Sequence, residues 1–356
     1  MTSATVRICD GASARRGAAD VAGMAILACC ALWALITATA RGGGPEGVLL
    51  AVLALAAGYA CGRIGGAVLP VGACAMASAA GLYLAVTASP AVSSADPSRT
   101  GMSGISTSPL GHTSPVAALL VLSAGAACCG AWATGRGGLR LVLRLFALGT
   151  AAVSAALGSA AGLVGCVAVL LCSLAAARVT HRGRALAGLG LAVGLLVATV
   201  WAAAASAIPG GLADTLTARL SGHRVALWQD ALLLAERDPA LGVGPGRYAE
   251  FSAAAQQLLH SDIRPHSAPL QLAAEQGLIG VALSATAFCW LLHALWRSSR
   301  STPFVLTAGL ALASVAATAT VGNTLSFAAV TVGVGVLAGL ATARPLHEDW
   351  ADADGR

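Results

Sequence analysis

The stretch VAGMAILACCALWALITATA, residues 21–40, contains no charged side chain. An α-helix needs about 20 apolar residues to cross the hydrocarbon core of a membrane, whereas the apolar part of a cleaved signal peptide has about 7–15. Arg7, Arg15 and Arg16 precede this stretch, and Arg41 follows it directly. The stretch therefore predicts a first membrane-spanning helix rather than a removable leader.

Similar apolar stretches recur along the whole chain. Of its 356 residues 57% are hydrophobic and only 10% are charged, and the mean hydropathy is +0.79. A soluble domain has about 25% charged residues, so a water-soluble fold could not bury this much apolar surface. We expect an all-α polytopic membrane protein of about ten transmembrane helices with one large helical extracytoplasmic loop. The ten predicted spans lie near 21–40, 47–62, 64–89, 115–134, 142–158, 161–178, 185–208, 278–296, 303–321 and 325–343. Only Gly158 to Gly162 separates the fifth from the sixth, so the two form either a tight hairpin or a re-entrant pair.

The arginines predict the orientation of these spans. The chain has a net charge of +6 and no lysine, and its arginines stand mainly at the ends of apolar runs. With the N-terminus inside, 14 of the 21 fall in the inward segments, as the positive-inside rule demands. The charge is therefore a topology signal rather than a sign of nucleic-acid binding, and we expect both termini to be cytoplasmic.

The predicted spans divide the chain into four parts. Residues 1–208 form an N-terminal transmembrane bundle of about seven spans, and residues 209–277 form the large loop. Residues 278–343 supply about three further spans, and 344–356 form a cytoplasmic tail. A second outward segment, 90–114, is rich in Ser, Pro, Gly and Thr, a composition typical of a flexible surface loop.

The large loop has sequence that is competent to fold. A helix is expected from the N-cap Ser221 to Arg237, and a second helix from about Arg247 to Leu259. Between them lies a glycine-rich turn. We expect these helices to form a lid on the spans, burying four side chains at helical spacing, namely Trp228, Leu232, Tyr248 and Phe251.

Arginines and histidines in this loop suggest a kind of chemistry. The guanidinium fork of an arginine matches phosphate oxygens, and an imidazole can accept a proton near neutral pH. Most such residues on a loop are merely solvated, so composition alone does not assign them a role. No lysine follows the glycine turn and no buried strand precedes it, which argues against a nucleotide-binding loop. The ten cysteines show no zinc spacing, and none lies in the large loop.

The order of residues across 224–283 resembles the O-antigen ligase and polymerase family of bacterial surface-polysaccharide enzymes. The first element of the resemblance is Arg224-x-x-x-Trp228, and the second is a Pro-x-x-Gly-x-Gly-x-Gly turn followed by an aromatic residue. The third is a histidine, His266, with ten residues between it and Gly277, and the last is Glu-x-Gly-Leu-Ile-Gly. The structural glycines of these motifs are Gly242, Gly244, Gly246, Gly277 and Gly280.

The resemblance implies a metal-independent, inverting glycosyltransferase of the bacterial plasma membrane that needs no cofactor. Its donor would be a glycan on undecaprenyl pyrophosphate, and its acceptor a hydroxyl of a sugar, lipid or protein. His266 would be the catalytic base, and Arg224 would act at the pyrophosphate. Further substrate-binding candidates are Arg247, Arg264, Trp228, Tyr248 and Glu275; for the two aromatic residues, packing is the alternative.

Two alternatives stay open. A polysaccharide or lipid flippase, or a transporter, would share the layout, but the predicted spans hold no Asp, Glu or Arg away from their ends, which argues against an ion-coupled carrier. An inactive homologue is the other alternative. The family often has Ser-Arg where this chain has Ser159-Ala160, and often has Asn after the histidine, where this chain has Ser267.

Overall fold

The computed structural model of the chain describes residues 2–89, 113–205, 222–256 and 265–344. Within these ranges the chain is helix, turn and loop, with no β-strand, in agreement with the predicted all-α class. Almost all of the predicted flexible segment 90–114 lies outside the described residues, as do Ser221 and Arg264.

In the described part of the chain up to residue 205, the helices are α1 Thr2–Arg41, α2 Glu46–Val68, α3 Pro70–Thr87, α5 Thr113–Ala133, α6 Gly137–Ala156, α7 Ala160–Ala175, the 3-10 turn η2 Ala176–Arg178 and α8 Arg182–Ala204. The others are α10 Gly222–Arg237, α11 Tyr248–Phe251, α12 Ala253–Gln256, α13 Ala268–Arg297, α14 Thr302–Val321, the 3-10 turn η3 Thr324–Ser326 and α15 Ala328–Thr342.

Nine helices in the described ranges are long and apolar enough to cross a membrane. They overlap the first nine predicted spans. The tenth prediction corresponds to α15, an apolar helix of only 15 residues. At about 1.5 Å of rise per residue, α15 is shorter than a typical hydrocarbon core, and the turn η3 precedes it.

One predicted boundary was wrong. The sequence suggested a break at Arg63, but α2 continues past this residue to Val68. The break falls at Leu69, whose φ of −138° and ψ of 70° are not helical. Pro70 explains this position, because a proline disfavours the helical conformation of the residue before it. The fifth and sixth spans, by contrast, form a tight hairpin, in which Gly158 has a φ of +69°.

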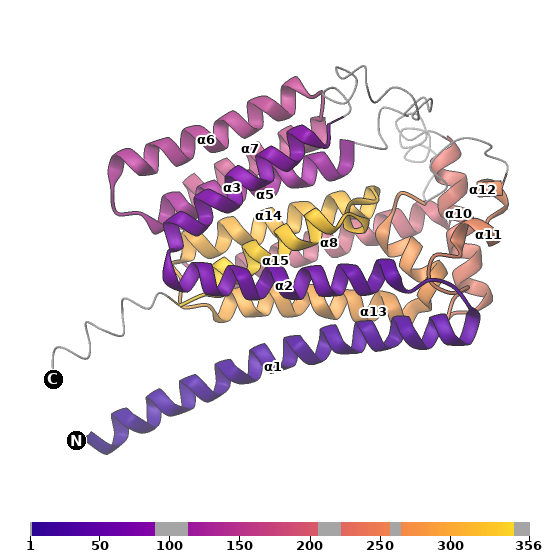
Figure 1. Ribbon diagram of the computed structural model, residues 1–356, viewed down its shortest axis with the longest axis horizontal. Helices are drawn as coiled ribbons and strands as arrows, with labels where there is room; N and C mark the ends of the chain where they lie inside the picture. The colour runs from indigo at the N-terminus through magenta and orange to yellow at the C-terminus, as the bar shows by residue number, and fades with distance from the viewer. Residues whose placement is uncertain (1, 90–112, 206–221, 257–264, 345–356) are drawn as a thin grey trace.

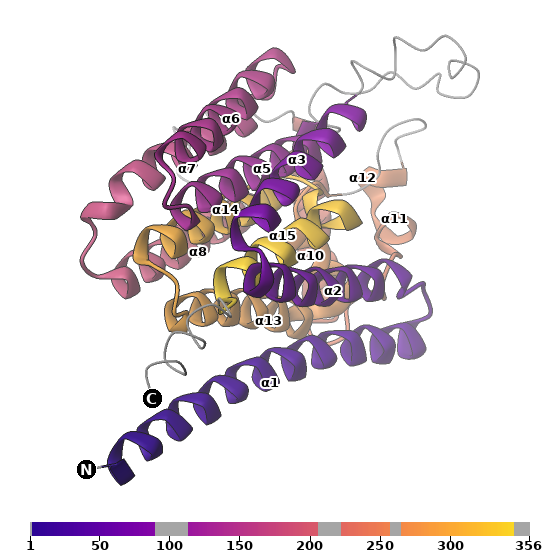
Figure 2. The same cartoon turned by 60° about the vertical axis from the view of Figure 1, so that its left-hand side comes forward.

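The helices run roughly along one axis, and α10, α11 and α12 gather at one end of the bundle (Figure 1). We call this the α10 end. The start of α1 and the end of α15 both lie at the opposite end (Figure 1). Figure 2 shows α1 along one side of the bundle and α6 on the other, with α14 and α15 between them. Helix α5 is almost entirely buried in the centre.

Small residues allow the closest helix pair, α2 and α15, to pack backbone against backbone. A Cβ atom on Gly335 would lie 2.3 Å from the carbonyl oxygen of Leu55, and one on Gly58 would lie 2.4 Å from that of Val332. In lipid such close packing, rather than hydrophobicity, drives the association of helices.

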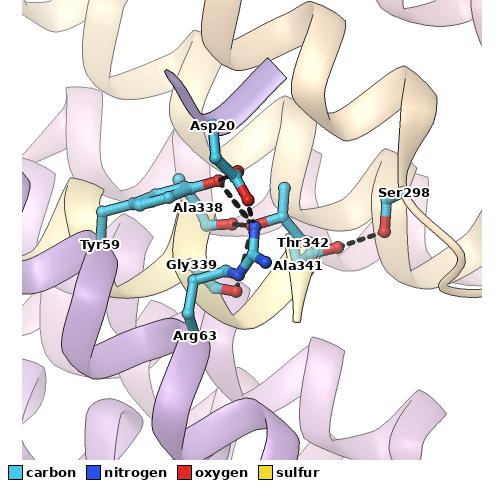
Figure 3. Close-up of polar contacts among 8 residues, drawn as sticks. All are labelled: Asp20, Tyr59, Arg63, Ser298, Ala338, Gly339, Ala341 and Thr342. Carbon is cyan, nitrogen blue, oxygen red and sulfur yellow. Dashed lines mark hydrogen bonds and ion pairs between the residues drawn. The ribbon is translucent and has the colours of Figure 1, made fainter. Parts of the chain in front are cut away.

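Polar side chains join three helices near the opposite end (Figure 3). Arg63 of α2 donates a hydrogen bond to Asp20 Oδ1 of α1 at 2.8 Å, and Tyr59 donates to the same atom at 3.2 Å. Thr342 of α15 donates to the Tyr59 hydroxyl at 3.2 Å. We call these four residues the Asp20–Arg63 cluster. The two charged side chains remain 41% and 34% exposed.

Candidate active site at the α10 end

Helix α10 is amphipathic and packs on the ends of the spans. Its buried apolar residues form one cluster with residues of α8 and α13, in which the α10 members are Leu227, Trp228, Ala231, Leu232 and Leu234. Burying a large apolar side chain stabilises a fold by about 1.5–3 kcal/mol. The predicted lid is therefore folded onto the bundle in the described part of the loop.

The glycine-rich turn after α10 is bound to a break in α13. Gly277 interrupts that helix with a φ of 70° and a ψ of −173°. At the break the backbone N–H groups of Val243 and Gly244 donate to the carbonyls of Ala274 and Glu275, at 2.9 and 3.0 Å. In return Leu278 donates to the carbonyl of Pro239 at 2.8 Å. We call this arrangement the turn–kink junction.

Two glycines of the family motifs are required by this junction. Gly242 and Gly277 both have positive φ values, which L side chains rarely adopt. A Cβ atom on Gly277 would lie 2.3 Å from the Ala240 carbonyl oxygen, and one on Gly242 would lie 2.5 Å from that of Ala274. The glycine-turn motif and the Glu-x-Gly-Leu-Ile-Gly motif thus belong to two chain segments that pack directly against each other.

The connection between α1 and α2 also lies at this end of the molecule, the side on which the predicted orientation of the spans places both Arg41 and the large loop. The indole of Trp33 donates to the carbonyl of Gln276, next to the kink, at 3.0 Å. Arg41 forms an ion pair with Asp238, and its carbonyl accepts from Arg247 Nη1. The orientation of the spans predicted the side of the membrane on which Arg41 lies, but no motif predicted these two contacts.

Arg247 is surrounded by protein partners. Besides the Arg41 carbonyl, its Nε donates to Glu250 at 2.8 Å, and its guanidinium lies 4.8 Å from the ring centroid of Phe251. These contacts give Arg247 a structural role, because they join α11 to the end of α1. Substrate binding by Arg247 stays a prediction. The expected burial of Phe251 was wrong, because its side chain is 44% exposed and faces the guanidinium.

The prediction of one continuous helix from Arg247 to Leu259 was also wrong. Its described part consists of two four-residue helices, α11 and α12, separated at Ser252. The carboxylate of Asp230 on α10 explains the break. Its Oδ2 atom accepts from the Ser252 hydroxyl at 2.8 Å and from the Ala254 backbone N–H at 2.7 Å. The aspartate thus satisfies a backbone N–H group at the start of α12.

The structure brings the chain segments of Arg224 and His266 together. Trp228 lies one turn after Arg224 on α10, is 1% exposed, and donates from its indole N–H to the carbonyl of Pro265 at 2.7 Å. His266 follows directly, and at a φ of 50° it is the one described non-glycine residue in the left-handed region. Such backbone strain, of order 1–3 kcal/mol, is concentrated at functional sites.

Arg224 is half-buried at this point. One guanidinium nitrogen, Nη1, donates to the carbonyl of Val321 at the end of α14, at 3.3 Å. Burial away from water lowers the pKa of Arg224 from its ordinary value. An arginine remains protonated despite such a shift, so a cation is held here in partly dry surroundings, where its attraction for an anion is stronger than in water.

The other predicted substrate-binding residues lie within the packed part of this region. Tyr248 is 2% exposed and donates to the Leu227 carbonyl at 2.8 Å, and burial raises its pKa to about 12. Glu275 is 6% exposed and accepts from the side chain of Gln271 at 3.2 Å. The contacts of Tyr248 and Trp228 favour the packing alternative for both aromatic residues. Ser159 caps α7, where its hydroxyl accepts from the Gly162 N–H at 3.2 Å.

Comparison with known proteins adds one match. The family model described as O-antigen ligase (Wzy_C) matches residues 145–285. This range runs from α6 into α13 and includes every residue predicted for the site. No curated protein and no solved structure matches the chain. An O-antigen ligase domain implies glycosyl transfer and lipid-linked glycan substrates. The chain is thus a multi-pass membrane protein whose residues 145–285 are similar to the O-antigen ligase family.

Proposed function

We propose that this protein moves a glycan from undecaprenyl pyrophosphate to an acceptor hydroxyl during the synthesis of a bacterial surface polysaccharide. The observation that carries the proposal is the Trp228–Pro265 hydrogen bond. Inside the matched ligase domain, it ties the helix of Arg224 to the strained segment of His266. A cation for a phosphate and a base for a hydroxyl are thereby held on adjoining elements.

The reaction needs one base and one site for negative charge. In the proposed step, His266 accepts the proton of the acceptor hydroxyl while the hydroxyl oxygen bonds to the anomeric carbon. The bond from that carbon to the pyrophosphate oxygen breaks, and undecaprenyl pyrophosphate leaves with the electron pair. Direct displacement inverts the anomeric configuration. Arg224 stabilises the charge that develops on the leaving group, without need of a metal ion.

The proposal also places the α10 end outside the cell, with both termini in the cytoplasm. The inward arginine bias supports this orientation. In a cysteine-free background, a membrane-impermeant maleimide added to intact cells should label Glu236→Cys, an exposed position on α10. Gly135→Cys, in the connection at the opposite end with open space around it, should react only after lysis. The reverse pattern would invert the topology.

The catalytic assignment is tested by glycan transfer from a lipid-pyrophosphate donor with purified variants. His266→Ala should lower the rate by about 10² to 10⁴, because a general base is lost. Arg224→Lys should also lower it, since a lysine keeps the charge but lacks the planar fork.

Matched controls separate the site from the rest of the molecule. His293→Ala changes an exposed histidine of α13, and Arg237→Lys an exposed arginine of α10. Both should transfer at the parental rate. Parental activity of a folded His266→Ala protein would refute the base. A parent that transfers nothing from any donor of this class would favour an inactive homologue.

A further inference from the structure

Ser267, the residue after His266, has a buried hydroxyl group that is not paired with any described residue. Its side chain is 1% exposed, and its Oγ atom has no hydrogen-bond partner within the described part of the chain. Leaving a buried polar atom unsatisfied costs about 1–3 kcal/mol, so nearly all such atoms in native proteins are paired. An exception beside the candidate base calls for an explanation.

The missing hydrogen bond is unusual for the position that Ser267 occupies. It is the N-cap residue of α13, with a φ of −150° and a ψ of 111°. A serine at this position ordinarily accepts a hydrogen bond from the second or third N–H group of the helix. Here the second residue is Pro269, which has no N–H, and the serine side chain makes no capping bond. Within the described ranges, Oγ therefore lies unpaired at the N-terminus of a helix.

The same helix end has further donors. The first bond of α13 is donated by Gln271 to the Ser267 carbonyl at 2.9 Å, so the N–H groups of Ala268 and Leu270 precede the intrahelical ladder. These N–H groups carry the positive end of the helix dipole. Leu270 packs in one cluster with Trp228, which places this first turn against α10. Hydroxyl, amides and dipole together suit an anion with several acceptor oxygens.

We infer that the Ser267 hydroxyl and the first turn of α13 form a subsite for a phosphate group of the donor's pyrophosphate. This inference rests on the proposed function. Ser267 donates to a phosphate oxygen, while the half-buried guanidinium of Arg224 neutralises charge from α10. The cost of the unsatisfied hydroxyl in the free protein is recovered when the lipid pyrophosphate binds.

The test compares two buried serines of the same region. Ser267 and Ser252 are both 1% exposed, but the hydroxyl of Ser252 donates to Asp230 at 2.8 Å. Purified parent, Ser267→Ala and Ser252→Ala proteins in nanodiscs are titrated with undecaprenyl pyrophosphate, and separately with inorganic pyrophosphate. Thermal unfolding of each protein is measured without ligand.

The subsite predicts opposite effects for the two variants. Ser267→Ala should bind undecaprenyl pyrophosphate about tenfold more weakly than the parent, because a hydrogen bond to a charged group is lost. Its unfolding temperature should be unchanged or higher, because an unsatisfied polar atom has been removed. Inorganic pyrophosphate should show a similar loss, since the contact is to phosphate and not to the lipid tail. Ser252→Ala should unfold at a lower temperature and bind both probes as the parent does.

Several results would overturn the subsite. One is equal affinity of Ser267→Ala and the parent, and another is a loss for the lipid that inorganic pyrophosphate does not share. A third is thermal destabilisation of Ser267→Ala like that of Ser252→Ala, with parental affinity, which would make the hydroxyl structural.

If Ser267→Ala fails to fold, Ser267→Cys, close in size but a poor donor, should show the same tenfold loss. A parent that binds no undecaprenyl pyrophosphate would overturn the proposed function together with the subsite, whereas equal binding by parent and variant overturns the subsite alone.

Discussion

The turn–kink junction and the Asp20–Arg63 cluster both join segments that are far apart in the sequence, but they do so by different means. At the junction, backbone N–H and carbonyl groups meet between residues 239–244 and 274–278, and glycines allow the approach. At the cluster, four side chains meet, and the two charged ones keep more than a third of their surface exposed. Backbone pairing fixes position with little freedom, whereas long exposed side chains can rearrange.

This difference matches what each end has to do. A candidate site that must hold a base and a cation at set positions benefits from a rigid frame. The cluster only has to keep α1 beside α2 and α15, and exposed ion pairs contribute little to stability. Changes at the junction should therefore be severe, and changes at the cluster mild.

The largest effect is expected for Gly277→Ala. The added Cβ would meet the Ala240 carbonyl at 2.3 Å, and the left-handed φ of 70° is unfavourable for alanine. We expect a destabilisation of roughly 3 kcal/mol or more, as for other strained backbone positions, together with loss of transfer. Thermal unfolding in detergent measures the first effect.

Gly149→Ala is the control, because nothing lies within 4 Å of the Cβ it would add. In a helix interior this change should stabilise by up to about 1 kcal/mol. If Gly277→Ala matched Gly149→Ala in unfolding temperature and rate, the junction would not be the rigid frame of the site.

An intermediate effect is expected for Trp228→Phe. The change removes the indole N–H that donates to the Pro265 carbonyl, and this buried carbonyl loses a partner at a cost of about 1–3 kcal/mol. Because Pro265 precedes His266, the glycan-transfer rate should fall further than the unfolding temperature alone would explain. Rate and unfolding temperature, measured on the same preparation, separate the two effects.

Trp296→Phe provides the matched change near the far end of α13, where the indole is 46% exposed. It should leave rate and unfolding temperature near the parental values. A Trp228→Phe protein that is destabilised but transfers normally would contradict the positioning of His266 by this hydrogen bond.

The smallest effect is expected for Asp20→Asn. Both partners of its ion pair are partly exposed, so the loss should be under about 1 kcal/mol. A double-mutant cycle with Arg63→Gln, read by thermal unfolding, isolates the pair. A coupling of several kcal/mol would show that the two ends are held with similar strength and would remove the contrast between them.

The sequence predicted the spans well, because the length of an apolar run is a local property that the bilayer sets directly. The helix break at Leu69 was not predicted, because the apolar run continues through this position. The break arises because Pro70 disfavours the helical conformation of the residue before it. Within the site, the order of motifs pointed to the glycines of the turn–kink junction and to the chain segments that hold Arg224 and His266. The contact between Arg41 and Asp238 did not, because no local pattern joins residues so far apart.

The break between α11 and α12 and the state of the Ser267 hydroxyl also depend on contacts between elements, which no local pattern describes. Ser252 ends α11 because Asp230, on another helix, accepts its hydrogen bond. Ser267 stood out in the sequence only as a departure from the family's usual asparagine. Its unused hydrogen-bonding capacity becomes visible once the first turn of α13 is in place.

The bond from Trp33 to the Gln276 carbonyl has a consequence for how the protein is made. Its two partners are 243 residues apart, one in the first span to be synthesised and the other in the eighth. At about 5–20 residues per second, the ribosome needs roughly 12 to 50 s to add the second partner after the first. The first span therefore has to wait in the membrane, beside the place where its partner will arrive. Assembly of the α10 end is therefore a late event of biosynthesis, and a ribosome that stops before α13 leaves behind a bundle without the turn–kink junction.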